Sequence, residues 1–138
     1  GLQAASTGSW VLEGRPSQGV LMQVDPGAPG QPGALWGAWF GFAPVQHEGA
    51  GHPHWLTLAG RGLPGQPGVV ELEWTRTTAG LLDSLPTTNS HVVGNGRLRF
   101  TACDRAVLEY SFHAPGLALD AFSGQQGQVN LRRFEPCR

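Results

Sequence analysis

The sequence contains no lysine: all nine basic residues are arginine, and charged residues make up only 14% of the 138 residues. The formal net charge is −1. Proteins that bind nucleic acid or anionic membranes need clustered basic side chains, and no such cluster occurs here. We therefore predict no nucleic-acid partner. The chain also lacks a run of 18 apolar residues, so we expect no membrane span.

Cysteine is scarce as well, because Cys103 and Cys137 are the only two in the chain. Two thiolates alone rarely hold a metal ion, which leaves two free buried thiols or a disulfide. We predict a disulfide that fastens the end of the chain to the rest of the fold, with a contribution of about 3–4 kcal/mol to stability. A disulfide implies an oxidising compartment, so we expect a secreted protein, extracellular or periplasmic.

Residues 1–10 lack both the charged and the apolar region of a signal peptide. We interpret them either as a mature N-terminus left after signal removal or as the start of a domain cut from a longer chain. Residues 1–7 are expected to be flexible.

The abundant residues are glycine and proline, with 21 and 11 copies. They favour a fold with many turns, while 40% hydrophobic residues and five tryptophans exclude disorder. The length fits a single domain, residues 1–138.

Apolar residues recur with period 2 along much of the chain, as in residues 69–77, where Val70, Leu72 and Trp74 share one face. This alternation predicts eight strands, at residues 9–13, 19–24, 34–42, 54–60, 69–77, 96–102, 106–112 and 128–134. Residues 81–95 are predicted as a long loop or a short helical turn. We predict an all-β, antiparallel up-and-down meander that forms a closed or nearly closed small barrel with long Gly/Pro loops.

The predicted strand at residues 34–42, ALWGAWFGF, is apolar on both faces. We expect Trp36, Phe40 and Phe42 to fill the core, and Trp39 to face outward under a loop or a partner. An exposed aromatic surface marks an interaction site. The candidate binding residues are Trp39, Trp55 and Trp36.

The densest polar cluster comprises His47, Glu48, His52 and His54. Imidazole and carboxylate groups are ligands of Zn or Cu. However, Pro53 interrupts a regular strand at this point. We interpret the segment as a solvated loop and predict no cofactor, with a Cu or Zn site as the alternative.

The candidates for catalysis are weak. Ser123 lacks the strand-to-helix turn of a nucleophile, and Ser111 faces outward on a predicted strand. Glu71 and Glu73 share what reads as a solvent-facing side of a strand. We predict that the protein is not an enzyme.

Arg132 and Arg133 are adjacent on a predicted strand, so one of them must face inward or toward an edge. An inward arginine is expected to pair with a buried acid, and Glu73 or Glu109 could serve.

Several segments carry a resemblance, most clearly GHPHWLTLAG at 51–60, GRLRFTACDRAVLEYSF at 96–112 and GQVNLRRF at 127–134. They resemble an uncharacterised all-β domain of secreted proteobacterial proteins, with the pattern G-x-P-x-W-L … G-x-L-x-F-x-x-C-x-x-A-x-L-x-Y … L-x-R-F. The N-terminal half departs from it, since Val11 follows GSW where that family has an aromatic residue. The resemblance implies secretion and a β fold, and it implies no chemistry.

A weaker likeness is to streptavidin-type barrels, which also begin with a G-x-W strand and carry glycine-spaced aromatic strands such as WLTLAGRG. No ligand-binding residue is carried over from them.

These observations favour a non-catalytic secreted or periplasmic binding or assembly module, with a protein partner or self-assembly as the expected contact. One alternative is a carrier that holds a small apolar ligand in the barrel interior. A carbohydrate on the aromatic strand is a further candidate ligand. The remaining alternative is a metal-binding protein that uses the loop from His47 to His54.

Overall fold

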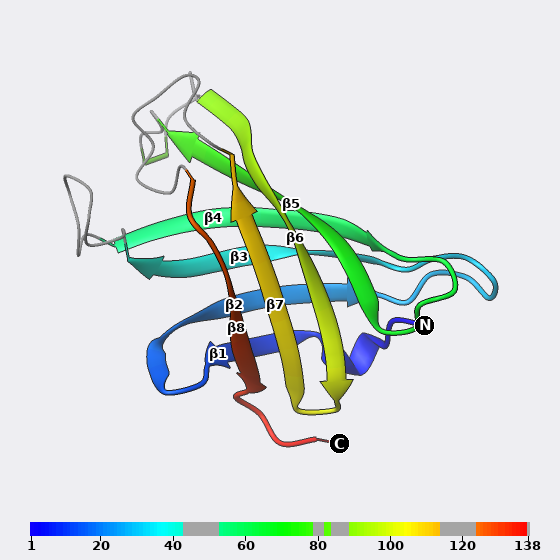
Figure 1. Ribbon diagram of the computed structural model, residues 1–138. Helices are drawn as coiled ribbons and strands as arrows, with labels where there is room; N and C mark the ends of the chain where they lie inside the picture. Colours follow the sequence, from blue (N-terminus) through cyan, green and yellow to red (C-terminus); the bar gives the residue numbers. More distant parts are fainter. Residues whose placement is uncertain (43–52, 79–81, 84–88, 114–123, 138) are drawn as a thin grey trace.

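The computed structural model describes residues 1–42, 53–78, 82–83, 89–113 and 124–137. Its strands form a closed antiparallel barrel in which each strand pairs with its neighbours in sequence and the last pairs with the first (Figure 1). The elements are a 3-10 turn η1 (Ala4–Ser6) and the strands β1 (Gly8–Leu12), β2 (Arg15–Asp25), β3 (Ala34–Phe42), β4 (Pro53–Gly62), β5 (Val69–Thr78), β6 (Asn89–Ala102), β7 (Arg105–Phe112) and β8 (Gln126–Arg133). The predicted fold is confirmed, and the barrel is closed.

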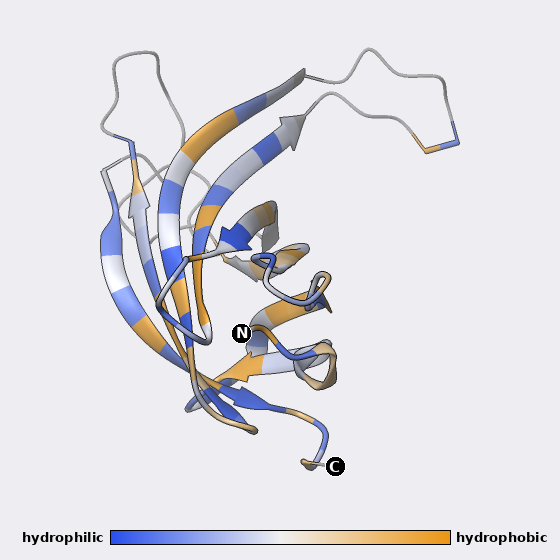
Figure 2. Cartoon of the chain, turned by 90° about the vertical axis from the view of Figure 1, so that its right-hand side faces the viewer, coloured by the Kyte–Doolittle hydropathy of each residue, from blue (hydrophilic) through white to orange (hydrophobic). Residues whose placement is uncertain are grey.

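Alternation along the strands determines which side chains fill the barrel. On β5, Val70, Leu72 and Trp74 are buried, while Glu71 and Glu73 are exposed. Figure 2 shows the same pattern as hydrophilic and hydrophobic bands along the strands. Because buried residues from all eight strands meet in one cluster, the interior is a single hydrophobic core.

The strand β6 is longer than the sequence indicates, because it begins at Asn89 rather than at residue 96. The register against β5 shifts at one point: Val92 lies opposite Thr75 and Gly94 opposite Trp74, which leaves Val93 without a counterpart. Such a bulge disturbs the alternation of inward and outward residues. The prediction of a loop throughout residues 81–95 was therefore wrong for residues 89–95.

The N-terminal segment packs against the barrel. Leu2 is buried in the core cluster, and the turn Ala4–Ser6 lies beside β1 and β2. Of the residues 1–7, which are expected to be flexible, Leu2 and the turn Ala4–Ser6 contact the barrel.

The two faces of β3 are the reverse of the prediction. Trp39 points into the barrel, since it lies opposite Val20 of β2 and Leu56 of β4, which are both buried. Trp36 and Phe42 instead face outward and are 49% and 42% exposed. The reason is that both faces of this strand are apolar, so its own alternation cannot specify the inward side; the pairing with two amphipathic neighbours does.

Candidate functional site

The outer surface of β2, β3 and β4 carries a group of exposed apolar side chains, which we call the outer aromatic face. Trp55 is 57% exposed and Leu21 is 50% exposed, in addition to Trp36 and Phe42, and Phe40 is half-buried. Phe40 lies directly opposite Trp55 in the β3–β4 ladder. Opposed aromatic side chains on one sheet face stabilise each other. This pairing still leaves much of Trp55 uncovered.

Trp36 also lines two shallow hollows on the same side of the barrel, with volumes of about 670 and about 650 Å³. The two hollows share Trp36, Ala59 and Glu73. A third hollow, of about 800 Å³, shares Glu71 and Asn95 with the second and continues toward β8. We call these three adjoining hollows, which are shallow and open to solvent, the outer trough. Its lining includes Ala38, Thr57, Ala59, Thr75, Asn95, Ser111 and Gln126.

Charges of alternating sign cross the floor of the outer trough. Arg61 lies opposite Glu71, Glu71 opposite Arg97, and Arg97 opposite Glu109. Arg97 and Glu71 form an ion pair between exposed side chains. Opposite charges on neighbouring strands offset one another, so this row offers little attraction to an ionic ligand.

Aromatic rings occupy part of the barrel interior. The ring of Trp39 lies 5.1 Å from that of Trp74 and 5.3 Å from that of Tyr110, and Phe112 stacks on it at 6.2 Å. Rings at these separations are in direct contact. Side chains therefore fill the barrel at this level, which counts against an interior ligand there. The Nε1 group of Trp74 is buried and has no hydrogen-bond partner among the described residues.

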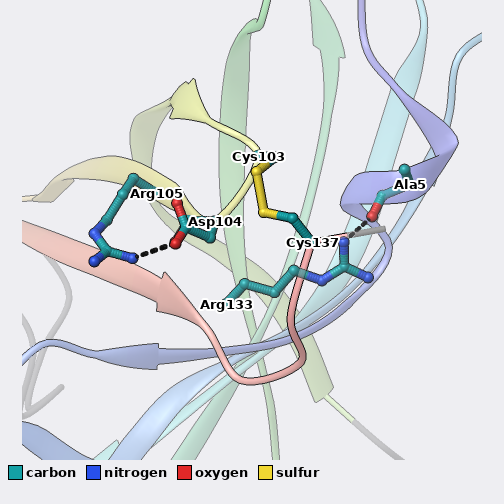
Figure 3. Close-up of a disulfide and its surroundings, with 6 residues drawn as sticks. All are labelled: Ala5, Cys103, Asp104, Arg105, Arg133 and Cys137. Atoms are coloured by element: carbon teal, nitrogen blue, oxygen red, sulfur yellow. Dashed lines mark hydrogen bonds and ion pairs between the residues drawn. A yellow bond between two sulfur atoms is a disulfide. The ribbon is translucent and has the colours of Figure 1, made fainter.

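The predicted disulfide between Cys103 and Cys137 is present, with Cα atoms 5.9 Å apart (Figure 3). It joins the turn between β6 and β7 to the segment that follows β8. Such bonds are typical of oxidising compartments. Among the described residues, Cys103, Asp104 and Cys137 form the one group with the spacing of metal ligands. Because both sulfur atoms are in the disulfide, this group offers no thiolate to a metal.

Arg133 is the inward-facing arginine of the pair at the end of β8, as the alternation required. Its guanidinium donates hydrogen bonds to the carbonyl oxygens of Ala5 and Thr7, and Glu135 lies 3.8 Å away (Figure 3 shows the bond to Ala5). The predicted partners, Glu73 and Glu109, were wrong. The structure pairs β8 with β1, and this brings the N-terminal segment to the arginine.

The other predicted site residues divide between described and undescribed parts of the chain. His47, Glu48 and His52 lie outside the described residues, as does Ser123. His54 is the second residue of β4, and its side chain is not among those described. Trp55 is exposed as a binding residue requires. Trp36 is exposed although it was expected in the core, and Trp39 is packed inside although it was expected outside.

The outer trough was missed at the sequence level. Its uncharged polar lining comes from residues scattered over several strands, and Thr57 and Gln126 are 69 positions apart. The alternation on each strand predicts that these residues face outward, but it does not reveal which of them are neighbours.

A comparison of the chain with protein-family models, curated proteins and solved structures finds no match. Within the described residues, no helix is long and apolar enough to cross a membrane. Its fold and surface define the protein as a small, closed eight-stranded barrel with a disulfide and an aromatic outer face.

Proposed function

We propose that this protein is a non-catalytic secreted or periplasmic binding or assembly module, which contacts a protein partner or a second copy of itself through the outer aromatic face. The observation that carries the proposal is the exposure of Leu21, Trp36, Phe42 and Trp55 on one side of three adjacent strands. Apolar side chains exposed together gain free energy when another apolar surface covers them.

The residue types fit this role. Tryptophan and other large aromatic side chains dominate the binding energy at protein interfaces. A fully presented aromatic side chain offers about 150–250 Å², so three that are about half exposed supply on the order of 300 Å². A standard interface needs about 800 Å² from each partner. The outer aromatic face is thus the centre of a contact whose rim comes from the surrounding polar surface.

Two observations support the remaining parts of the proposal. The disulfide supports an oxidising compartment. The carboxylate of Glu71, one of the candidate catalytic acids, is engaged in an ion pair with Arg97, which supports a non-catalytic role.

A photo-crosslinking side chain at position 55, introduced into the full chain in the organism that produces it, tests the proposal. We expect one discrete crosslinked product, either at twice the mass of the chain or with a single other protein. The control carries the same group at exposed Arg132 on β8, across the barrel from β4. Equal crosslinking at both positions, or none at position 55, would contradict the proposed contact surface.

A further inference from the structure

We propose that the outer trough binds a neutral glycan chain that lies across the strands, with one sugar ring stacked on Trp36. This site overlaps the protein contact proposed above at Leu21 and Trp36, and it differs from that contact because Phe40, Phe42 and Trp55 do not line the trough.

The shape favours an extended ligand. The trough runs from Trp36 on β3 to Gln126 on β8, with each hollow sharing residues with the next. Five steps between adjacent strands, at ~4.8 Å each, make a path of about 24 Å along the surface. The lining is carried by paired strands, which hold their side chains in place before a ligand arrives. A linear polymer fits such a path, whereas a compact small molecule would use only one hollow.

The lining is rich in uncharged groups that both donate and accept hydrogen bonds. Thr57, Thr75, Asn95, Ser111 and Gln126 supply hydroxyl and amide groups along the path. The hydroxyl of Thr57 already donates to the carbonyl oxygen of Thr75, so it is available as an acceptor. Hydroxyl and amide side chains can each donate to and accept from the hydroxyls of a sugar. This match repeats on successive strands, as the hydroxyls repeat along a glycan.

Trp36 supplies a flat apolar surface at one end of this polar path. Its side chain is 49% exposed and lies opposite the small Ala59, so the neighbouring strand leaves space beside the ring. A sugar ring presents C–H groups on its faces, and these contact an aromatic ring favourably. Tryptophan provides this contact at little cost in side-chain entropy.

The charges along the trough disfavour the other polymers. Carboxylates of Glu71, Glu73 and Glu109 outnumber the guanidinium groups of Arg61 and Arg97 in the lining. A nucleic acid or an anionic polysaccharide requires the opposite balance. A peptide that binds by adding a strand needs an open sheet edge, and a closed barrel offers none.

Affinity electrophoresis of the full chain tests the proposal, in native gels that contain galactomannan, xyloglucan or laminarin as neutral probes and alginate as an anionic one. We expect at least one neutral probe, and not alginate, to retard the protein. Trp36→Ala should weaken that binding by about tenfold, as expected for loss of one stacked ring, and Asn95→Ala should weaken it less. The matched control is Phe134→Ala, which removes an aromatic side chain that is 75% exposed outside the trough.

Four results would overturn the proposal: no retardation by any neutral probe, stronger retardation by alginate, full binding by Trp36→Ala, or equal loss in the Phe134→Ala control. Thermal unfolding of each variant distinguishes loss of binding from loss of fold. The third of these results, combined with loss of binding in Trp55→Ala, would place the glycan beside Trp55 instead of in the trough. The crosslinking at position 55 is read independently, so failure of either proposal leaves the other standing.

Discussion

Arg133 of β8 lies opposite Trp10 of β1, at the pairing that closes the barrel. Both residues fasten the same N-terminal segment. The indole Nε1 of Trp10 donates to the carbonyl oxygen of Ser6 at 2.9 Å, and the guanidinium of Arg133 donates to those of Ala5 and Thr7. The side chain of Arg133 is only 7% exposed. The closure of the barrel and the order of its N-terminal segment are therefore coupled through these two side chains.

Replacing Arg133 with alanine should lower the free energy of unfolding by about 2–4 kcal/mol, since hydrogen bonds from a buried charged donor are lost and carbonyl groups remain behind. Urea denaturation followed by circular dichroism measures the change. Arg132→Ala is the matched control, because that neighbouring side chain is exposed, and its effect should stay within about 0.5 kcal/mol. Similar losses in the two variants would show that Arg133 contributes no more to the free energy of unfolding than an exposed arginine does.

The assignment of faces on β3 makes a second prediction. Trp39→Ala should cost about 3–5 kcal/mol of stability, as for removal of a large aromatic side chain from a core, because its ring contacts Trp74, Tyr110 and Phe112. Trp36→Ala should cost less than about 1 kcal/mol, since half of its surface already faces water. Thermal or urea unfolding separates the two. Equal losses of stability in the two variants would contradict the outward position of Trp36.

These two tryptophans also illustrate what the sequence could and could not predict. The eight strands and the barrel followed from alternation and turns, because a strand such as residues 69–77 has one apolar and one polar side. Residues 34–42 have two apolar sides, so their orientation depends on β2 and β4, with which they pair. That information is not contained in the strand itself.

The candidate site depends even more on pairing. Trp55 and Trp36 could be selected by residue type alone. The trough needs Asn95, Ser111 and Gln126 to be neighbours, and this follows from the registers of β6, β7 and β8. The bulge at Val93 shifts the register of β6, and no local sequence signal located it. Register is a property of the assembled sheet, so the site does not follow from the sequence of any one strand.

The disulfide yields a third prediction. The double variant Cys103→Ala/Cys137→Ala should lose about 3–4 kcal/mol, because the bond closes a loop with a sequence separation of 34 and restricts the unfolded chain. Both cysteines are exposed, so a mild reductant should lower the wild-type stability to the level of the variant. Urea denaturation with and without reductant provides the comparison. A wild type that is unaffected once its thiols are free would refute the assigned contribution.

Close approach of strands β4 and β5 requires a glycine at position 60. A Cβ atom there would lie 1.9 Å from the backbone oxygen of Glu71, so Gly60→Ala must displace a strand and should cost about 2 kcal/mol or more. Two residues along the same strand, a Cβ at Gly62 would have its nearest neighbours at an ordinary 3.5 Å. Gly62→Ala should therefore be neutral or slightly stabilising. Thermal unfolding of the two variants provides the measurement, and a neutral Gly60→Ala would contradict the strand spacing.

Two buried tryptophans differ in hydrogen bonding, and this difference can be measured. Trp10 and Trp74 are both fully buried, but the Nε1 group of Trp10 donates to Ser6 whereas that of Trp74 has no partner among the described residues. Replacement by phenylalanine removes a similar volume at each position. At position 10 it also leaves a carbonyl oxygen without its donor, while at position 74 it removes a donor that is buried and unsatisfied. Trp10→Phe should therefore cost about 1–3 kcal/mol more than Trp74→Phe, as measured by urea denaturation followed by circular dichroism. A larger cost at position 74 would mean that its indole nitrogen has a partner, and the aromatic cluster around Trp39 would be the place to search for it.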